Sequence, residues 1–254
     1  MTIVLIILYI LFGLIGLVLL AHLFAYFFVG RTIKSEVKPY LQSSDDVEVT
    51  LRPWVVMRPR KTAIKAGIIF HPGGYVDAES YARIFNHVAA AGYLCVLVPG
   101  PQRTPMAKRF AADGVMDAFP EINQWYISGH SQGGAVASLY VRDREEKPEY
   151  FKKIAGIIFL GFFVFDRHSH AHRSLPCLSV YGSRDGHADK FKPNEKNLPQ
   201  GAKVVCIEGG NHGQFGAYTF HFGDQTPEIP RHDQQDIAIN AIKEFLAEKT
   251  AGVN

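Results

Sequence analysis

A serine in a glycine-rich turn is the residue best placed for covalent chemistry. Ser131 lies in the sequence GHSQGG over residues 129–134, directly after the strand-like segment QWYIS and before the helix-like segment AVASLYVRD. A sharp turn from strand to helix exposes a serine hydroxyl, and glycines two positions away on either side let neighbouring backbone approach closely. The pattern therefore predicts that Ser131 is a nucleophile.

A serine hydroxyl is a weak nucleophile, so it needs a base and a carboxylate that orients the base. Asp185 comes just past the strand-like segment CLSVY, and His212 comes just past KVVCIE. Acid and histidine follow the serine in the chain order expected for a triad on a parallel sheet. We therefore expect Asp185 and His212 to complete a catalytic triad. Rival acids and bases lie in less favourable positions, within a helix, after the preceding strand or in irregular sequence: Asp189, Asp166, His221 and His232.

Acyl transfer also needs two backbone N–H groups that stabilise the negatively charged oxygen of the tetrahedral intermediate. One is expected from Gln132, which follows the nucleophile. The other is expected from the loop HPGGY over residues 71–75, which follows the strand-like segment GIIF. Gly74 and Tyr75 are both candidates for this second donor. We expect His71 to hold the loop by hydrogen bonds rather than to transfer a proton.

Three alternating histidines could present their imidazoles on one face of an extended strand, as metal ligands do. They are His168, His170 and His172. Because no cysteine or carboxylate is spaced to complete a metal site, we interpret this stretch as a solvated loop. The triad chemistry itself requires neither a metal nor an organic cofactor. The cysteines each fall in a short apolar run and are expected to be buried structural residues: Cys95, Cys177 and Cys206.

Short apolar runs alternate with helix-like segments through the rest of the chain. Strands are expected at 67–70, 93–98, 124–128, 155–160, 177–181 and 203–207, after one or two early strands within 47–57. Helices are expected at 78–91, 107–119, 131–144, 187–197 and 233–249. This alternation predicts an α/β fold with a mainly parallel central sheet, helices on both faces and no large cap. Ligands then bind at the carboxyl ends of the strands.

Residues 1–30 contain none of the 27 basic and 24 acidic residues of the chain. A hydrocarbon core of roughly 30 Å is crossed by about 20 apolar residues, and residues 2–30 exceed that length with His22 as their one notably polar member. A cleavable signal peptide would have a basic start and a shorter apolar stretch, so we favour one uncleaved transmembrane helix. Basic residues follow the span but do not precede it, which predicts that the folded domain faces the cytoplasm.

The expected organisation is a transmembrane anchor over residues 1–30, a juxtamembrane linker over 31–46 and a folded domain over 47–254. The net charge of +3 is small and evenly spread, and no basic run is interleaved with aromatics, which excludes a nucleic-acid partner. An aromatic content of 12% excludes a disordered chain, and no Gly-X-Y period or sustained heptad is present. The composition is that of a globular domain behind an apolar helix.

Four segments together resemble the α/β-hydrolase superfamily, and specifically its compact α/β-hydrolase-5 family. They are HPGGYVDAESYA, GHSQGG, LSVYGSRDG and EGGNHGQFGAY, the last followed by GDQTP, and the similarity runs from about residue 62 to 245. The resemblance implies the α/β-hydrolase fold, with Ser131 as nucleophile, Asp185 as orienting acid and His212 as base. His71 before PGG and the histidine-rich stretch depart from the family pattern.

The function we expect is cleavage of a carboxylic ester or thioester through an acyl-enzyme, by a membrane-anchored serine hydrolase. The substrate is a small-molecule or lipophilic ester. Aromatic residues beyond His212 either line a pocket for a lipophilic acyl group or pack their own loop: Phe215, Tyr218, Phe220 and Phe222. An acyltransferase with the same triad and a non-catalytic, membrane-tethered binding protein are the alternatives.

Overall fold

The computed structural model describes residues 2–221 and 223–251, and eight strands within them form one sheet. The strands lie in the order β1-β2-β4-β3-β5-β6-β7-β8. Strands β1 and β2 pair antiparallel with each other and β2 with β4, whereas every other pairing is parallel. The bounds are β1 Val47–Thr50, β2 Val55–Pro59, β3 Ala66–His71, β4 Tyr93–Leu97, β5 Trp125–His130, β6 Ile154–Leu160, β7 Cys177–Gly182 and β8 Lys203–Ile207. The expected mainly parallel sheet is confirmed.

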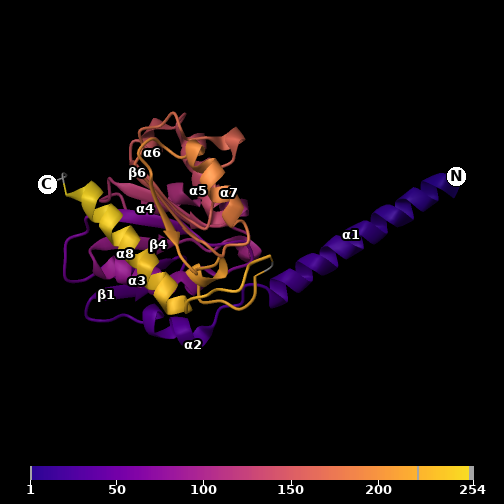
Figure 1. Ribbon diagram of the computed structural model, residues 1–254, viewed down its shortest axis with the longest axis horizontal. Coiled ribbons are helices and arrows are strands. Elements are labelled where there is room, and N and C mark those ends of the chain that lie inside the picture. The colour runs from indigo at the N-terminus through magenta and orange to yellow at the C-terminus, as the bar shows by residue number, and fades with distance from the viewer. Residues whose placement is uncertain (1, 222, 252–254) are drawn as a thin grey trace.

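Helices cover both faces of the sheet because successive side chains of a buried strand point to opposite faces. In β3, Ile68 and Phe70 pack with residues of α3 (Ala82–Ala90) and α8 (Arg231–Thr250), whereas Ile69 packs with α4 (Ala111–Ala118) and α5 (Gln132–Arg144). Figure 1 shows α8 and α3 together in front of the strands. The shorter helices are α2 Lys34–Val37, α6 Pro148–Phe151 and α7 Ala188–Asn194. The expected helices on both faces of the sheet are confirmed.

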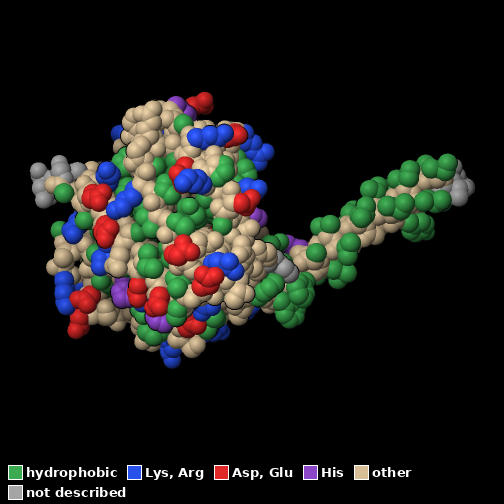
Figure 2. Space-filling view, in the orientation of Figure 1, with side chains coloured by type: hydrophobic (Ala, Val, Ile, Leu, Met, Phe, Trp, Pro, Cys, Tyr) green, Lys and Arg blue, Asp and Glu red, His purple; other side chains and the backbone are tan. Residues whose placement is uncertain are grey.

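Helix α1 (Thr2–Phe28) extends away from the rest of the chain (Figure 1). Its residues Ile3–Phe28 have a mean hydropathy of 3.2 and are long and apolar enough to cross a membrane, a property shared with signal sequences. Figure 2 shows hydrophobic side chains exposed along the helix. A soluble environment would not favour such a surface, since each exposed apolar side chain costs free energy in water.

Residues 31–46, expected as a linker, pack on the folded domain. The Ile33 N–H donates to the Ala217 carbonyl at 2.9 Å, and Thr32 forms an antiparallel bridge with Tyr218. Val37 in α2 is buried in the same core cluster as α3 and α8. The chain is therefore attached to the domain from Thr32 to Val37, immediately after α1.

One expectation about burial is wrong. Cys95 and Cys177 are buried, but Cys206 is exposed. Strand β8 is the edge of the sheet. Within it Val205 packs against the core, whereas Cys206 points to the opposite face. An apolar run alone does not distinguish a central strand from an edge strand.

Candidate active site

Ser131 lies on the turn between β5 and α5 with φ 52° and ψ −117°. Such a backbone conformation costs a non-glycine residue of order 1–3 kcal/mol and persists only where the surroundings hold it. The Ser131 N–H donates to the Leu160 carbonyl at 3.0 Å. A Cβ on Gly129 would lie only 2.0 Å from the Gly133 carbonyl oxygen, so the turn can close this tightly only with glycine at position 129.

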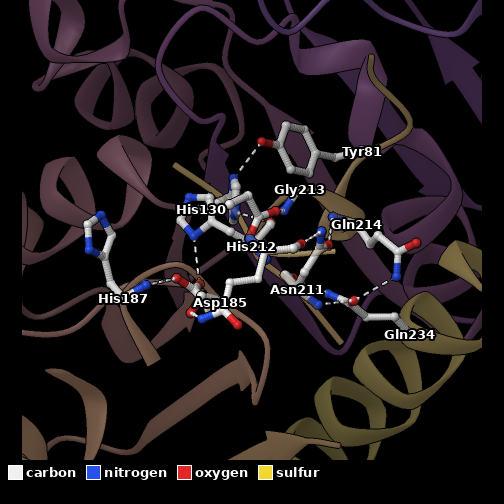
Figure 3. A network of polar contacts seen from close by, with 11 residues as sticks. Tyr81, His130, Asp185, His187, Asn211, His212, Gly213, Gln214 and Gln234 are labelled. Carbon is white, nitrogen blue, oxygen red and sulfur yellow. Dashed lines mark hydrogen bonds and ion pairs between the residues drawn. The ribbon is translucent and has the colours of Figure 1, made fainter. Parts of the chain in front are cut away.

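Asp185 and His212 are joined by a short hydrogen bond (Figure 3). The Nδ1–H of His212 donates to Asp185 Oδ2 at 2.7 Å, and the second carboxylate oxygen accepts the His187 N–H at 2.9 Å. Asp185 is fully buried, and His212 is 6% exposed. Because the proton lies on Nδ1, the other ring nitrogen of His212 carries a free lone pair that can accept a proton.

Ser131, Asp185 and His212 line one small cavity of about 60 Å³. The structure thus brings the three residues together, as the order of strands predicts. Among the rivals, His221 also lines this cavity, with its ring 4.9 Å from that of His212. The other rivals form ion pairs outside this cavity: Asp189 with Lys190, Asp166 with Lys196, and His232 with Asp233.

A second carboxylate holds the loop that carries His212. Asp224 Oδ1 accepts the His212 N–H at 3.0 Å, and Asp224 Oδ2 accepts the Gly213 N–H at 2.6 Å. On the other side, the Gln234 side chain both accepts the Asn211 N–H and donates to the Asn211 carbonyl. Sequence reasoning did not assign these residues. The acidic residue in the segment GDQTP is the signal that could have indicated the first contact.

His130, the residue before the nucleophile, connects the loop that carries His212 with the segment between β3 and α3 (Figure 3). Its Nε2 lies 3.1 Å from the His212 carbonyl oxygen, which can only accept, so Nε2 carries the proton. Its Nδ1 then accepts from the Tyr81 hydroxyl at 2.8 Å, and that hydroxyl accepts the Gly73 N–H at 3.1 Å. Burial holds the pKa of His130 well below its ordinary value, which keeps the ring neutral.

This chain of hydrogen bonds makes Tyr81→Phe an informative change. Removing the hydroxyl leaves the buried Gly73 N–H and His130 Nδ1 without partners, and unpaired buried groups cost about 1–3 kcal/mol each. We expect urea denaturation to show a loss of about 2 kcal/mol or more in the free energy of unfolding. Tyr93→Phe is the matched control, because its hydroxyl bonds Thr250 at 3.3 Å in a part-buried position. Equal losses in both variants would contradict the expectation.

The candidate oxyanion loop lies against the start of α5. A Cβ on Gly74 would lie 3.2 Å from Gln132 Oε1, so Gly74 and Gln132 are direct neighbours. The Tyr75 N–H already donates to the Arg103 carbonyl at 2.7 Å. Of the two candidate donors in this loop, the Tyr75 N–H is therefore occupied by Arg103, which favours Gly74 as the donor.

The hydrogen bonds expected from the His71 side chain are not made at Nε2. Its Nε2 is buried and has no hydrogen-bond partner among the described residues, and burial lowers its pKa to about 4. The backbone of His71 contacts the start of α5, because its carbonyl packs directly against Gly133. The imidazole does not pin the loop through Nε2.

The alternating histidines do not converge. His170 is buried rather than solvated and bonds through Nε2 to Ser138 Oγ at 2.8 Å, with its pKa lowered to about 3 by burial. The imidazole of His168 contacts the Arg142 guanidinium at 2.8 Å, and that of His172 lies 3.9 Å from Glu145. Among residues 2–221 and 223–251, no group of three or more His, Cys, Asp or Glu side chains is arranged to hold a metal ion.

The aromatic residues after His212 divide between packing and exposure. Phe215 and Tyr218 are buried, which favours a packing role, whereas Phe220 is 54% exposed. Phe222 lies outside the described residues. Among the described residues, these aromatic side chains therefore do not line one common acyl pocket.

Residues 67–236 match the model of the alpha/beta hydrolase family. The chain belongs to this family. The match covers the strands from β3 onward and contains Ser131, Asp185 and His212. No curated protein matches the chain in sequence.

Solved alpha/beta hydrolase structures share the fold at low sequence identity. An esterase from Pyrobaculum calidifontis has a TM-score of 0.58 and 14% identity, over 87% of this chain and 91% of the other. A thermophilic carboxylesterase cloned from a metagenomic library has a TM-score of 0.56 and 14% identity, over 86% and 93%. A soluble variant of monoglyceride lipase from Saccharomyces cerevisiae has a TM-score of 0.54 and 11% identity, over 82% and 97%. These structural neighbours are esterases and lipases.

Proposed function

We propose that the protein is a membrane-anchored serine hydrolase that cleaves an ester bond. The observation that carries this proposal is the buried Asp185–His212 hydrogen bond of 2.7 Å. Both residues line the same cavity as Ser131, which lies on a strained turn. A buried carboxylate, an oriented imidazole and a serine hydroxyl on the same cavity form the arrangement by which a serine is activated. The esterases and lipases among the structural neighbours support the same reaction class.

In the first half of the reaction, Ser131 Oγ attacks the ester carbonyl while His212 Nε2 takes the hydroxyl proton. Asp185 stabilises the resulting imidazolium through Nδ1–H. The tetrahedral intermediate collapses, the C–O bond to the alcohol breaks, and His212 returns the proton to the leaving alcohol. Water then attacks the acyl-enzyme in the same way and releases the acid and Ser131.

The negative charge on the tetrahedral oxygen is assigned to two backbone donors. Gln132 is the first residue of α5, and the N–H groups of a first helical turn have no partner within the helix. Gly74 lies beside it and supplies the second N–H. We assign Tyr75 a supporting role, since its N–H is bound to Arg103.

A fluorophosphonate probe tests the nucleophile directly, because it labels only an activated serine. We expect the parent chain to be labelled and Ser131→Ala to lose labelling and ester hydrolysis together. Ser183→Ala is the matched control, since Ser183 is half-buried in the loop after β7 but does not line the cavity. Equal labelling of Ser131→Ala and the parent would refute the assignment.

A further inference from the structure

A buried arginine completes the C-terminal end of α1 from inside the domain. The Arg103 guanidinium donates to the carbonyl oxygens of Val29 at 2.9 Å and Ala25 at 3.4 Å, and also to that of Tyr26. The last carbonyls of a helix otherwise lack partners, and a cation there also favours the helix dipole. Arg103 is 7% exposed and has φ 59°, so a strained loop holds this contact in place.

The same end of α1 contacts the loop that carries Gly74. His22 Nδ1 and the Tyr75 hydroxyl are 2.8 Å apart, and their ring centroids are 5.5 Å apart. Just beyond the helix, a Cβ on Gly30 would lie 2.5 Å from the Tyr75 carbonyl oxygen. Tyr75 itself has φ 60° and donates its N–H to the carbonyl of Arg103. The oxyanion loop is therefore fitted directly against α1.

The segment that follows His212 pairs with the residues just after α1. The Gly30 N–H donates to the Phe220 carbonyl at 3.0 Å, and the Thr219 N–H donates to the Arg31 carbonyl at 2.9 Å. The loop with the candidate oxyanion donor and the loop with the candidate base are thus both attached to one stretch, residues 22–33. His221, which lines the cavity with Ser131, directly follows Phe220, so this stretch is bonded to the residue next to the cavity lining.

The hydropathy of α1 indicates that residues 22–33 lie at the edge of a bilayer. Apart from the Tyr9 hydroxyl, residues 3–21 contain no charged, amide or hydroxyl side chain, and at 1.5 Å per residue they come close to the about 20 residues that cross a hydrocarbon core. His22 is the first strongly polar side chain, and it is the one that contacts Tyr75. Figure 2 shows hydrophobic side chains gathered where α1 meets the domain. Exposed phenylalanines of this region are Phe24, Phe27, Phe28 and Phe220.

We propose that the C-terminal end of α1 forms the membrane-facing wall of the active site, and that the substrate is a long-chain lipid ester entering from the adjoining leaflet. This inference rests on the serine hydrolase function proposed above. Each turnover consumes one water and converts the ester into a fatty acid and an alcohol. A long acyl chain can remain among the lipid chains beside the C-terminal end of α1 while its ester group reaches Ser131. A short-chain ester has no acyl chain long enough to benefit from this position.

Vesicles that separate or combine enzyme and substrate test the route of entry. The full chain is reconstituted in phosphatidylcholine vesicles, with dioleoylglycerol either in the same vesicles or in a second population. Entry from the bilayer predicts that initial oleate release is at least tenfold faster in the shared vesicles. Entry from water predicts equal rates, since a desorbed molecule finds either population, and equal rates would overturn the proposal.

Hydrolysis of p-nitrophenyl acetate in the same preparations separates this inference from the proposed function. If the acetate is cleaved and dioleoylglycerol is not, the lipid substrate is wrong while the serine hydrolase stands. If neither ester is cleaved and the fluorophosphonate probe does not label Ser131, the proposed function itself fails.

Two variants probe the wall. Arg103→Met removes the guanidinium that holds the end of α1, and His22→Leu removes the hydrogen bond to Tyr75. We expect each to lower the shared-to-separate ratio of oleate release at least threefold. Because this ratio is internal to each preparation, partial loss of folded protein does not change it. Arg109→Met is the matched control, since Arg109 is half-buried and pairs with Asp143 at 3.4 Å. An unchanged ratio in both test variants would contradict the role of α1.

Discussion

Asp185→Asn should lower kcat for ester hydrolysis by about four orders of magnitude. The reason lies in the two partners of the carboxylate. One oxygen accepts the His187 N–H at 2.9 Å, so the amide oxygen of an asparagine would occupy that position and direct its NH₂ group at His212 Nδ1. A donor at this nitrogen favours the tautomer with the proton on Nε2, which cannot accept the proton of Ser131.

Steady-state kinetics with a soluble ester measures this effect, and Asp189→Asn is the matched control. Asp189 is close in sequence but exposed, and it pairs with Lys190 at 2.7 Å rather than with a histidine. We expect its kcat to remain within about threefold of the parent. A large loss in Asp189→Asn together with a small loss in Asp185→Asn would exchange the two assignments.

Gly133→Ala should destabilise the protein by about 3 kcal/mol or more, as overpacking against rigid backbone does. A Cβ at this position would lie 2.0 Å from the His71 carbonyl oxygen and 2.4 Å from that of Pro72. Both obstacles are backbone atoms of the candidate oxyanion loop. Relief of the clash must move this loop away from α5, and a displacement of about 1 Å costs roughly 100-fold in activity.

Thermal denaturation and kcat/KM measure the two consequences, and Gly114→Ala is the control. Gly114 lies inside α4, and a Cβ there would meet no atom within 4 Å. Alanine in an open helical position is favoured over glycine by roughly 0.5–1 kcal/mol. Opposite signs of the change in Tm are therefore expected for the two glycine variants. A stable and active Gly133→Ala would show that the loop and α5 are not in close contact.

The sheet and its carboxyl edge could be predicted because both follow from local patterns. Strands such as β4 and β6 are short apolar runs, as expected for strands covered on both faces. Asp185 and His212 could be predicted as neighbours because β7 and β8 are parallel and adjacent, so the residues past their ends meet at one edge. The glycines around Ser131 carry an equally local steric requirement.

The supporting contacts could not be predicted, because they depend on the path of irregular segments. Asp224 reaches the His212 amide only because the chain between residues 213 and 224 turns back on itself. Arg103 lies in a proline-rich loop, and nothing local indicates that its side chain extends to carbonyls 73 to 78 residues away along the chain. The tautomer of His130 likewise depends on two partners from distant loops.

The pairing of residues 30–33 with residues 217–220 limits how this protein can evolve. A flexible tether can gain or lose several residues at little cost in free energy, because it only has to span the distance between its ends. Here Gly30, Arg31 and Ile33 are hydrogen-bonded in register with the segment after His212, so an inserted or deleted residue would misalign every one of these bonds. The distance from α1 to the nucleophile is thus set by register.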